Sequence, residues 1–208
     1  MKRVILNYLV VTTFALSALL IACQRENNDE NDGTANNTDS FVIEATNVIN
    51  SIDNTLSVKD IATVKAFLYS PYNDSYDIIA TGKCENGGFK LILPNPVDNK
   101  LLTVGNNPYP IKWVSDSKAK ISGLGAFQII AYDNAGNIIG GLHYCYGGED
   151  VYGYYVYVDR NFTIIGGPDW DYWNCTFNKG WNIIYAHDEY TTQKPSGVDV
   201  RWYYQDNF

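Results

Sequence analysis

The stretch IIATGKCENGGFKLIL, residues 78–93, contains the clearest evidence for the fold class. Asn86-Gly87 at its centre predicts a two-residue hairpin turn, because both positions of such a turn need a positive φ. This turn pairs Cys84 with Phe89 and gathers the apolar residues of both strands on one face. A shift of one residue would mix the two faces, so the pattern predicts antiparallel strands with a defined register. The expected apolar face consists of Ala80, Gly82, Cys84, Phe89, Leu91 and Leu93.

Two further turns predict hairpins. Residues 133–137 (DNAGN) have aspartate at the first position of a type I turn and glycine where φ is positive. They join expected strands at residues 127–132 and 138–146. Residues 178–180 (NKG) predict a three-residue loop between two antiparallel strands. The resulting register pairs Phe177 with Trp181, Cys175 with Ile183 and Trp173 with Tyr185 on one apolar face.

The rest of the chain adds short strands, and 17 Tyr and 5 Trp favour a pleated sheet over a helix. We therefore expect an all-β globular domain over residues 41–208, folded as an antiparallel β-sandwich or a partly open barrel. A division into two lobes, 41–105 and 111–208, stays open because prolines lie between them. The additional strands are expected at residues 41–49, 62–70, 118–122, 152–158, 161–166 and 197–204.

Two of these segments resemble known families. Residues 79–94, with the Asn86-Gly87 turn and the ending Leu-Ile-Leu-Pro, resemble the strand pair of transthyretin-like and carboxypeptidase-regulatory-like β-sandwiches. Residues 177–182 (FNKGWN) resemble the closing hairpin of many small uncharacterised surface lipoproteins. Both are turn-and-core patterns, so the resemblance implies a fold and no chemistry.

The N-terminus has the organisation of an export signal. Lys2 and Arg3 precede a mostly apolar stretch, residues 4–20, whose length alone also fits an uncleaved anchor helix. Leu20-Ile21-Ala22-Cys23 resembles the lipobox of bacterial lipoprotein precursors. That resemblance implies removal of residues 1–22 and acylation of Cys23 with diacylglycerol and a further chain such as palmitate. Several acyl chains anchor a protein stably to a membrane.

Residues 24–40 (QRENNDENDGTANNTDS) form the expected tether behind the lipidated cysteine. The segment contains no aromatic or large aliphatic residue and cannot bury enough surface to offset its ordering entropy, so we expect it to be disordered. By resemblance, Gln24 in place of aspartate implies an outer-membrane destination. The acidic residues Glu26, Asp29 and Glu30 resemble the export signal of Bacteroidetes-type surface lipoproteins, which implies the cell exterior.

The charge balance limits the partners. The net charge is −8 and becomes more negative without residues 1–22, which carry Lys2 and Arg3 and no acidic residue. An acidic chain repels phosphate backbones and anionic lipid, so we expect no nucleic-acid partner and no membrane contact besides the lipid anchor on Cys23.

Cysteines and histidines give no motif for chemistry. Cys84 and Cys175 fall on expected apolar faces, where a thiol acts as a small hydrophobe, and a Cys145–Cys175 disulfide is the alternative. His143 and His187 have no metal-ligand spacing. We expect no catalytic residue, no metal and no cofactor, although a pair of carboxylates for glycoside hydrolysis has no motif by which to exclude it.

The stretch GGPDWDYW, residues 166–173, is the candidate ligand site. Asp169, Trp170, Asp171 and Tyr172 combine rings that can stack on sugar faces with carboxylates that can bind hydroxyl groups. The alternative is that these rings cover the core. The tyrosine-rich residues 144–157 allow the same two interpretations, because alternating tyrosines can form a cross-strand ladder that only stabilises the sheet.

Three functions follow from this reasoning. The first is a non-enzymatic surface lipoprotein that binds an extracellular glycan or protein through loops and aromatic residues. The second is a structural or assembly accessory of an outer-membrane transporter or surface fibre. The third is a hydrolase.

Overall fold

The computed structural model describes residues 40–50, 60–106, 111–146, 151–167, 172–187 and 189–206. They belong to one compact unit, residues 37–208. The prediction of an all-β fold is confirmed, because these residues form strands, two 3₁₀ turns and no α-helix. None of their helical segments is long and apolar enough to cross a membrane. The expected export signal, residues 1–22, and the tether before residue 40 lie outside the described residues.

The elements in chain order have the following bounds: β1 Phe41–Ala45, β2 Val48–Asn50, β3 Thr63–Ser70, β4 Ser75–Glu85, β5 Gly88–Leu93, η1 Asp98–Lys100, β6 Leu102–Thr103, η2 Val104–Asn106, β7 Ile111–Val114, β8 Lys120–Ile121, β9 Phe127–Tyr132, β10 Ile138–Tyr146, β11 Val151–Val158, β12 Phe162–Gly166, β13 Trp173–Phe177, β14 Gly180–Ala186, β15 Tyr190–Thr191 and β16 Arg201–Gln205.

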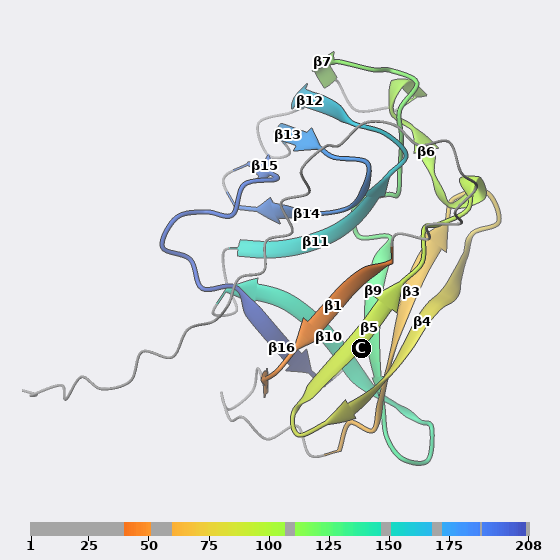
Figure 1. The fold of residues 1–208 in the computed structure, drawn as a ribbon, viewed down its shortest axis with the longest axis vertical. Coiled ribbons are helices and arrows are strands. Elements are labelled where there is room, and N and C mark those ends of the chain that lie inside the picture. The colour runs from red at the N-terminus through yellow and green to blue at the C-terminus, as the bar shows by residue number, and fades with distance from the viewer. Residues whose placement is uncertain are drawn as a thin grey trace, which may run out of the picture. The chain divides into compact units, whose positions relative to one another are not determined.

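Eight of the strands pair around a ring. The order is β1, β5, β4, β3, β9, β10 and β16, and β16 returns to β2. β1 and β2 are consecutive pieces of one segment, so that segment closes the ring by pairing antiparallel with β5 and parallel with β16. Figure 1 shows these strands curving around a common interior. β2 covers the edge of β16 that an open sheet would leave unpaired.

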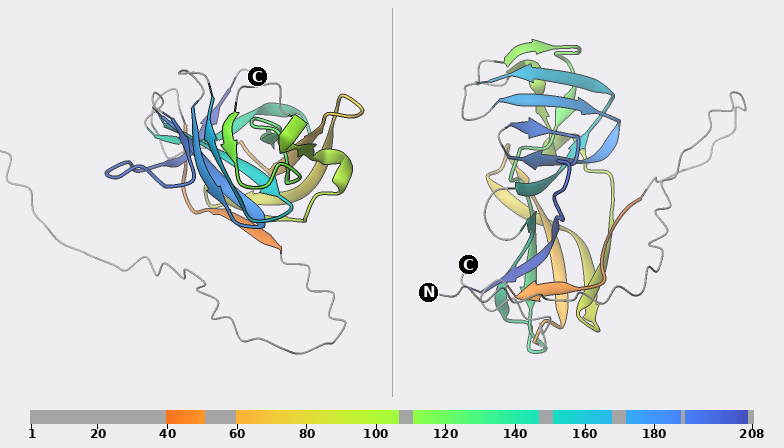
Figure 2. Two further views of the ribbon diagram at one scale, coloured as in Figure 1. Left: turned by 90° about the horizontal axis from the view of Figure 1, so that it is seen from above. Right: turned by 90° about the vertical axis from the view of Figure 1, so that its left-hand side faces the viewer.

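The remaining strands extend the sheet away from this ring. β11 pairs with β14, and the order continues through β15, β13 and β12 to β7. In the right-hand view of Figure 2, these strands lie above the strands of residues 41–93. The sheet is mixed, because β2 with β16 and β13 with β15 are parallel pairs in a mainly antiparallel arrangement.

Two hydrophobic cores lie on opposite faces of β11 and β14. Successive residues of a strand point to opposite faces, so Tyr155 and Tyr157 enter the first core while Val156 and Val158 enter the second. The first core fills the ring, and its largest fully buried side chains include Leu68, Leu91 and Leu93. Burying each such side chain contributes roughly 1.5–3 kcal/mol. The second core lies between β11–β14 and the strands β12 and β13.

Two of the three predicted turns are confirmed. Asn86 and Gly87 have φ of 53° and 77°, and Cys84 lies opposite Phe89 as expected. In the second turn, Asp133 Oδ1 accepts bonds from the backbone N–H groups of Ala135 and Asn137 at 2.9 and 2.8 Å. These bonds, with the side chain of Asn137, hold the pKa of the Asp133 carboxyl below its usual value.

The predicted pairing of β13 with β14 is wrong. β13 pairs with β12 and β15, and β15 lies between β13 and β14 in the sheet. The predicted apolar face therefore divides, with Cys175 and Phe177 in the second core and Trp181 in the first. The difference arises because β15, from a later part of the chain, pairs with both strands and lies between them. Within the connection, the Asn182 amide accepts from the backbone N–H of Asn178 and donates to the C=O groups of Asn178 and Gly180.

Candidate functional site

The candidate site lies where two strands diverge from β10. Leu142 pairs with β9, and Tyr144 pairs with β11, on the same side of β10, because β16 occupies the opposite side from Gly141 to Cys145. His143 is the residue between the two pairings. β9 and β11 must separate around it, which leaves an opening in the sheet beside the first core.

This opening is a pocket of about 350 Å³. Its volume is within the range of small-molecule sites, and such sites are usually lined by rings with a few polar groups. Six of the twelve residues around it are aromatic. The lining residues are Gly125, Phe127, Gln128, Ile129, Leu142, His143, Tyr144, Tyr152, Gly153, Tyr154, Tyr155 and Trp202.

Stacked rings form the floor of the pocket. Tyr155 and Trp202 are parallel to within 14°, with ring centroids 5.9 Å apart, and Tyr144 lies 5.2 Å from Trp202. Gly153 allows this arrangement, because a Cβ atom there would lie 2.5 Å from Cδ1 of Tyr144. The same three rings also line a second hollow of about 570 Å³ beside residues 44–49, so they separate two cavities.

Neutral polar groups stand around the mouth of the pocket. Tyr152 is exposed there, and Gln128 and His143 are half-buried. The Gln128 amide donates to the Tyr76 hydroxyl at 3.3 Å. Burial lowers the pKa of His143 and raises the pKa of Tyr154. At pH 7 the imidazole and the phenol are therefore both uncharged.

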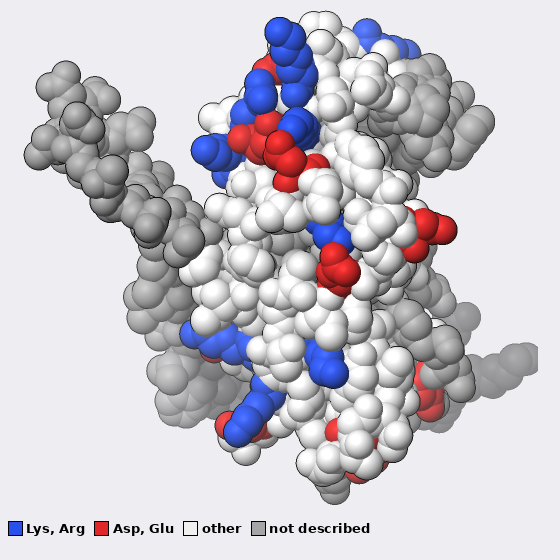
Figure 3. Space-filling model, turned by 90° about the vertical axis from the view of Figure 1, so that its right-hand side faces the viewer, with Lys and Arg blue, Asp and Glu red and all other residues white. Residues whose placement is uncertain are grey.

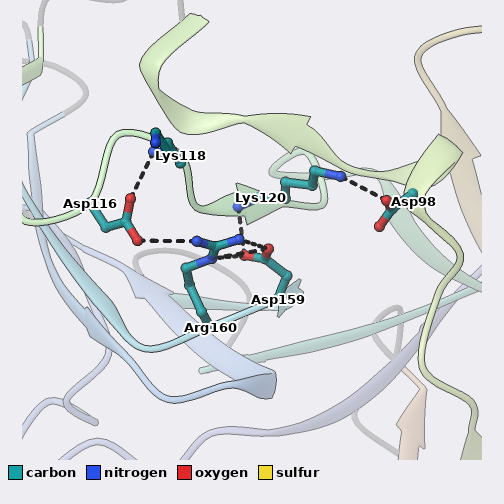
Figure 4. A network of polar contacts seen from close by, with 6 residues as sticks. All are labelled: Asp98, Asp116, Lys118, Lys120, Asp159 and Arg160. Carbon is teal, nitrogen blue, oxygen red and sulfur yellow. Dashed lines mark hydrogen bonds and ion pairs between the residues drawn. The ribbon is translucent and has the colours of Figure 1, made fainter.

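No described Asp, Glu, Lys or Arg lines the pocket. Charged side chains lie elsewhere and are mixed in sign on the face that Figure 3 shows. One group of them is a network around β8, in which Arg160 contacts Asp159 and Asp116 at 2.9 and 3.4 Å and Lys120 contacts Asp98 at 2.7 Å (Figure 4). Each of these carboxylates has a basic partner, so the network joins loops together.

Only one of the site residues predicted from the sequence falls within the described part of the chain. Cys23, Asp169, Trp170 and Asp171 lie outside the described residues. Tyr172 is described and half-buried, does not line the pocket, and has the ammonium of Lys112 5.3 Å from its ring centroid.

The thiols and carboxylates of the described residues show no reactive grouping. Cys145 and Cys175 do not form the disulfide that was the alternative expectation. The Cys175 thiol donates to the Tyr190 carbonyl at 3.2 Å, and burial raises its pKa to about 12. Within the described part of the chain, no three His, Cys, Asp or Glu residues gather as metal ligands would.

Sequence reasoning missed the pocket residues Gln128 and His143, and it left open whether the tyrosine-rich residues 144–157, which include Tyr152 and Tyr154, bind a ligand or only stabilise the sheet. The alternating tyrosines of β11 were the available signal, and the structure gives them two different roles. Tyr155 and Tyr157 pack in the first core, where Tyr155 also lines the pocket, whereas Tyr152 and Tyr154 border the pocket without belonging to that core. Comparisons with protein-family models, curated proteins and solved structures found no match to this chain.

Proposed function

We propose that this protein is a non-enzymatic surface lipoprotein of the outer membrane that binds a neutral carbohydrate. The observation that carries the proposal is the composition of the pocket at His143. It combines aromatic walls with uncharged hydrogen-bonding groups and has no Asp, Glu, Lys or Arg among its described lining residues.

This composition matches the chemistry of a sugar ring. The C–H groups of a pyranose face can stack on accessible rings such as Tyr152 and Tyr154, and its hydroxyl groups can bond to Gln128 and His143. A charged ligand would lose hydration without gaining a counter-charge, which is costly in a half-buried site. A purely apolar ligand would make no use of the polar groups of Gln128 and His143 at the pocket.

Binding without hydrolysis follows from the same lining. Glycoside hydrolysis by the common mechanisms requires two carboxyl groups on either side of the scissile bond. Three described carboxylates close in the chain to the lining residues already have partners: Asp133 is engaged in a turn, Asp159 in the network around β8 and Asp199 in an ion pair with Arg201. We therefore favour a binding role over a hydrolase.

The location rests on Cys23 and residues 24–40. Lipid on Cys23 would attach the chain to the membrane, and the polar tether would separate the domain from the headgroups. Metabolic labelling with palmitate tests this part. We expect label in the natural chain and none in a Cys23→Ser variant, with protease treatment of intact cells showing whether the domain faces outward. Label in both forms would contradict it.

Isothermal titration with neutral and acidic sugars tests the binding role. We expect at least one neutral saccharide to bind, and Gln128→Ala to weaken it roughly three- to tenfold through loss of one hydrogen bond. Gln193→Ala is the matched control, because Gln193 is an exposed amide away from the pocket. Binding of uronic acids alone, or equal affinity in the Gln128→Ala variant, would overturn the proposal.

A further inference from the structure

A line of residues crosses the sheet from the pocket to the start of β13. Tyr152 of β11 lies opposite Ala186 of β14, Ala186 lies opposite Tyr190 of β15, and Tyr190 lies opposite Trp173 of β13. Residues directly opposite one another in a sheet share a face. These side chains therefore lie on one face, in a row perpendicular to the strands.

The rings along this row are in contact from end to end. The Tyr152 and Tyr154 centroids are 6.4 Å apart, Tyr154 and Tyr190 are 6.5 Å apart, and Tyr190 and Trp173 are 5.0 Å apart. The Ala186 side chain is too short to contact the rings of Tyr152 and Tyr190, and the Tyr154 ring contacts both of them instead. All four rings are exposed or half-buried. We call Tyr152, Tyr154, Tyr190 and Trp173 the aromatic row.

The aromatic row begins inside the proposed sugar site. Tyr152 and Tyr154 line the pocket, whereas Tyr190 and Trp173 lie beyond it. A ligand that filled only the pocket would not reach Trp173. A row of rings that leaves a pocket in one direction suits a ligand that is itself extended and repeating.

We infer, on the basis of the proposed function, that the aromatic row continues the pocket into a binding path for a linear neutral glycan chain. One sugar unit enters the pocket and successive units stack on Tyr190 and Trp173. Stacking on a row of rings depends on the apolar faces that all units of the chain share, so affinity rises with the number of units. The polar groups of the pocket distinguish the terminal unit.

The competing explanation is that the outer rings only cover the second core. Trp173 and Tyr190 do pack against its margin. The two explanations differ in one measurable respect, because a cover for the core has no effect on how affinity depends on the length of a saccharide. The test therefore uses chain length as its variable.

The experiment is isothermal titration of the full-length protein with maltose-, cellobiose- and mannobiose-type oligosaccharides of increasing length. We expect affinity to rise roughly tenfold or more between the single sugar and the hexamer of the preferred series, as contacts at the outer rings add to those in the pocket. Trp173→Ala should remove most of this rise and leave the affinity for the single sugar unchanged.

Two variants serve as controls. Trp173→Phe keeps a ring at the position and should retain the dependence on length. Trp113→Ala removes an exposed tryptophan of β7 that belongs to neither the pocket nor the row, and should change nothing. If a saccharide binds with the same affinity at every length, the inference is overturned while the proposed function stands. If no saccharide of any series binds, both are overturned.

Discussion

The two cores on either side of β11 and β14 are built from different side chains. The first contains buried Phe89, Tyr155, Tyr157, Trp181 and Trp202, whereas the second consists mainly of aliphatic residues with one stacked phenylalanine pair. Flat rings meet at fixed angles and fill space less evenly than branched aliphatic chains. The pocket adjoins the core that is rich in rings.

Because of this difference, we expect substitutions on the two faces of the sheet to affect stability and binding differently. Val156 and Val158 on one face of β11 contribute packing, and Tyr155 on the other face contributes both packing and the floor of a pocket. Substitutions in the second core should therefore change stability alone. Substitutions beside the pocket should change binding at a smaller cost in stability.

The largest expected effect is in the second core. Phe177 is fully buried and stacks on Phe162 at 4.9 Å, so Phe177→Ala should cost about 3–5 kcal/mol of unfolding free energy. Phe127→Ala should cost less, because the Phe127 ring already borders the pocket and its loss enlarges an existing hollow. Guanidinium denaturation measures both. Equal losses would refute the distinction between the cores.

The next effect concerns the packing of Tyr144. Gly153→Ala places a methyl group 2.5 Å from the Tyr144 ring, so the ring must move. We expect a loss of about 1–3 kcal/mol, typical of overpacking, together with weaker sugar binding as the floor of the pocket shifts. Gly123→Ala is the control, since its nearest new contact would be an ordinary 3.5 Å. A Gly153→Ala variant with unchanged stability and unchanged binding would argue against this account.

The turns show which parts of the fold the sequence could predict. Asn86-Gly87 and residues 133–137 were predictable because the residues that need positive φ lie within the turn itself. Residues 178–180 carry a similar signal, yet the strands on either side do not pair with each other. The two residues of β15 that separate them arrive from a later part of the chain, which no local pattern indicates.

The same argument applies to the site. The alternation of tyrosines in β11 was visible, but the pocket exists because β9 and β11 diverge at His143. That divergence depends on β16 taking the other side of β10 and on β2 closing the ring. These pairings join segments distant in the chain, so the sequence could suggest ring-rich strands and could not place their rings around a cavity.

A smaller effect tests the connection between β13 and β14. Asn182→Ala removes the side-chain bonds to Asn178 and Gly180, and should cost about 0.5–1.5 kcal/mol. Asn134→Ala, in an exposed turn, is the matched control. Chemical denaturation measures both variants. If Asn182→Ala were no less stable than the control, the amide would not be what fixes this connection.

The smallest effect is a pH dependence of stability that comes from His143, beside the first core. Burial lowers the pKa of His143 below its value in the unfolded chain, so the folded state binds this proton less readily than the unfolded state does. The contribution of the neutral imidazole to stability is therefore fully present above the unfolded pKa of about 6.5. It is lost progressively as the pH falls from there towards the folded pKa.

Thermal unfolding of the natural protein and of His143→Gln between pH 5 and 8 measures the contribution of His143 to the pH dependence of stability. We expect the natural protein to lose slightly more stability than the variant as the pH falls, and the two curves to run parallel above about pH 7. His187 and every carboxylate are common to both proteins, so the difference isolates His143. A variant that loses more stability than the natural protein at low pH would mean that His143 gains a favourable charged contact in the fold. The mouth of the pocket would then be suited to an acidic ligand and not to a neutral sugar.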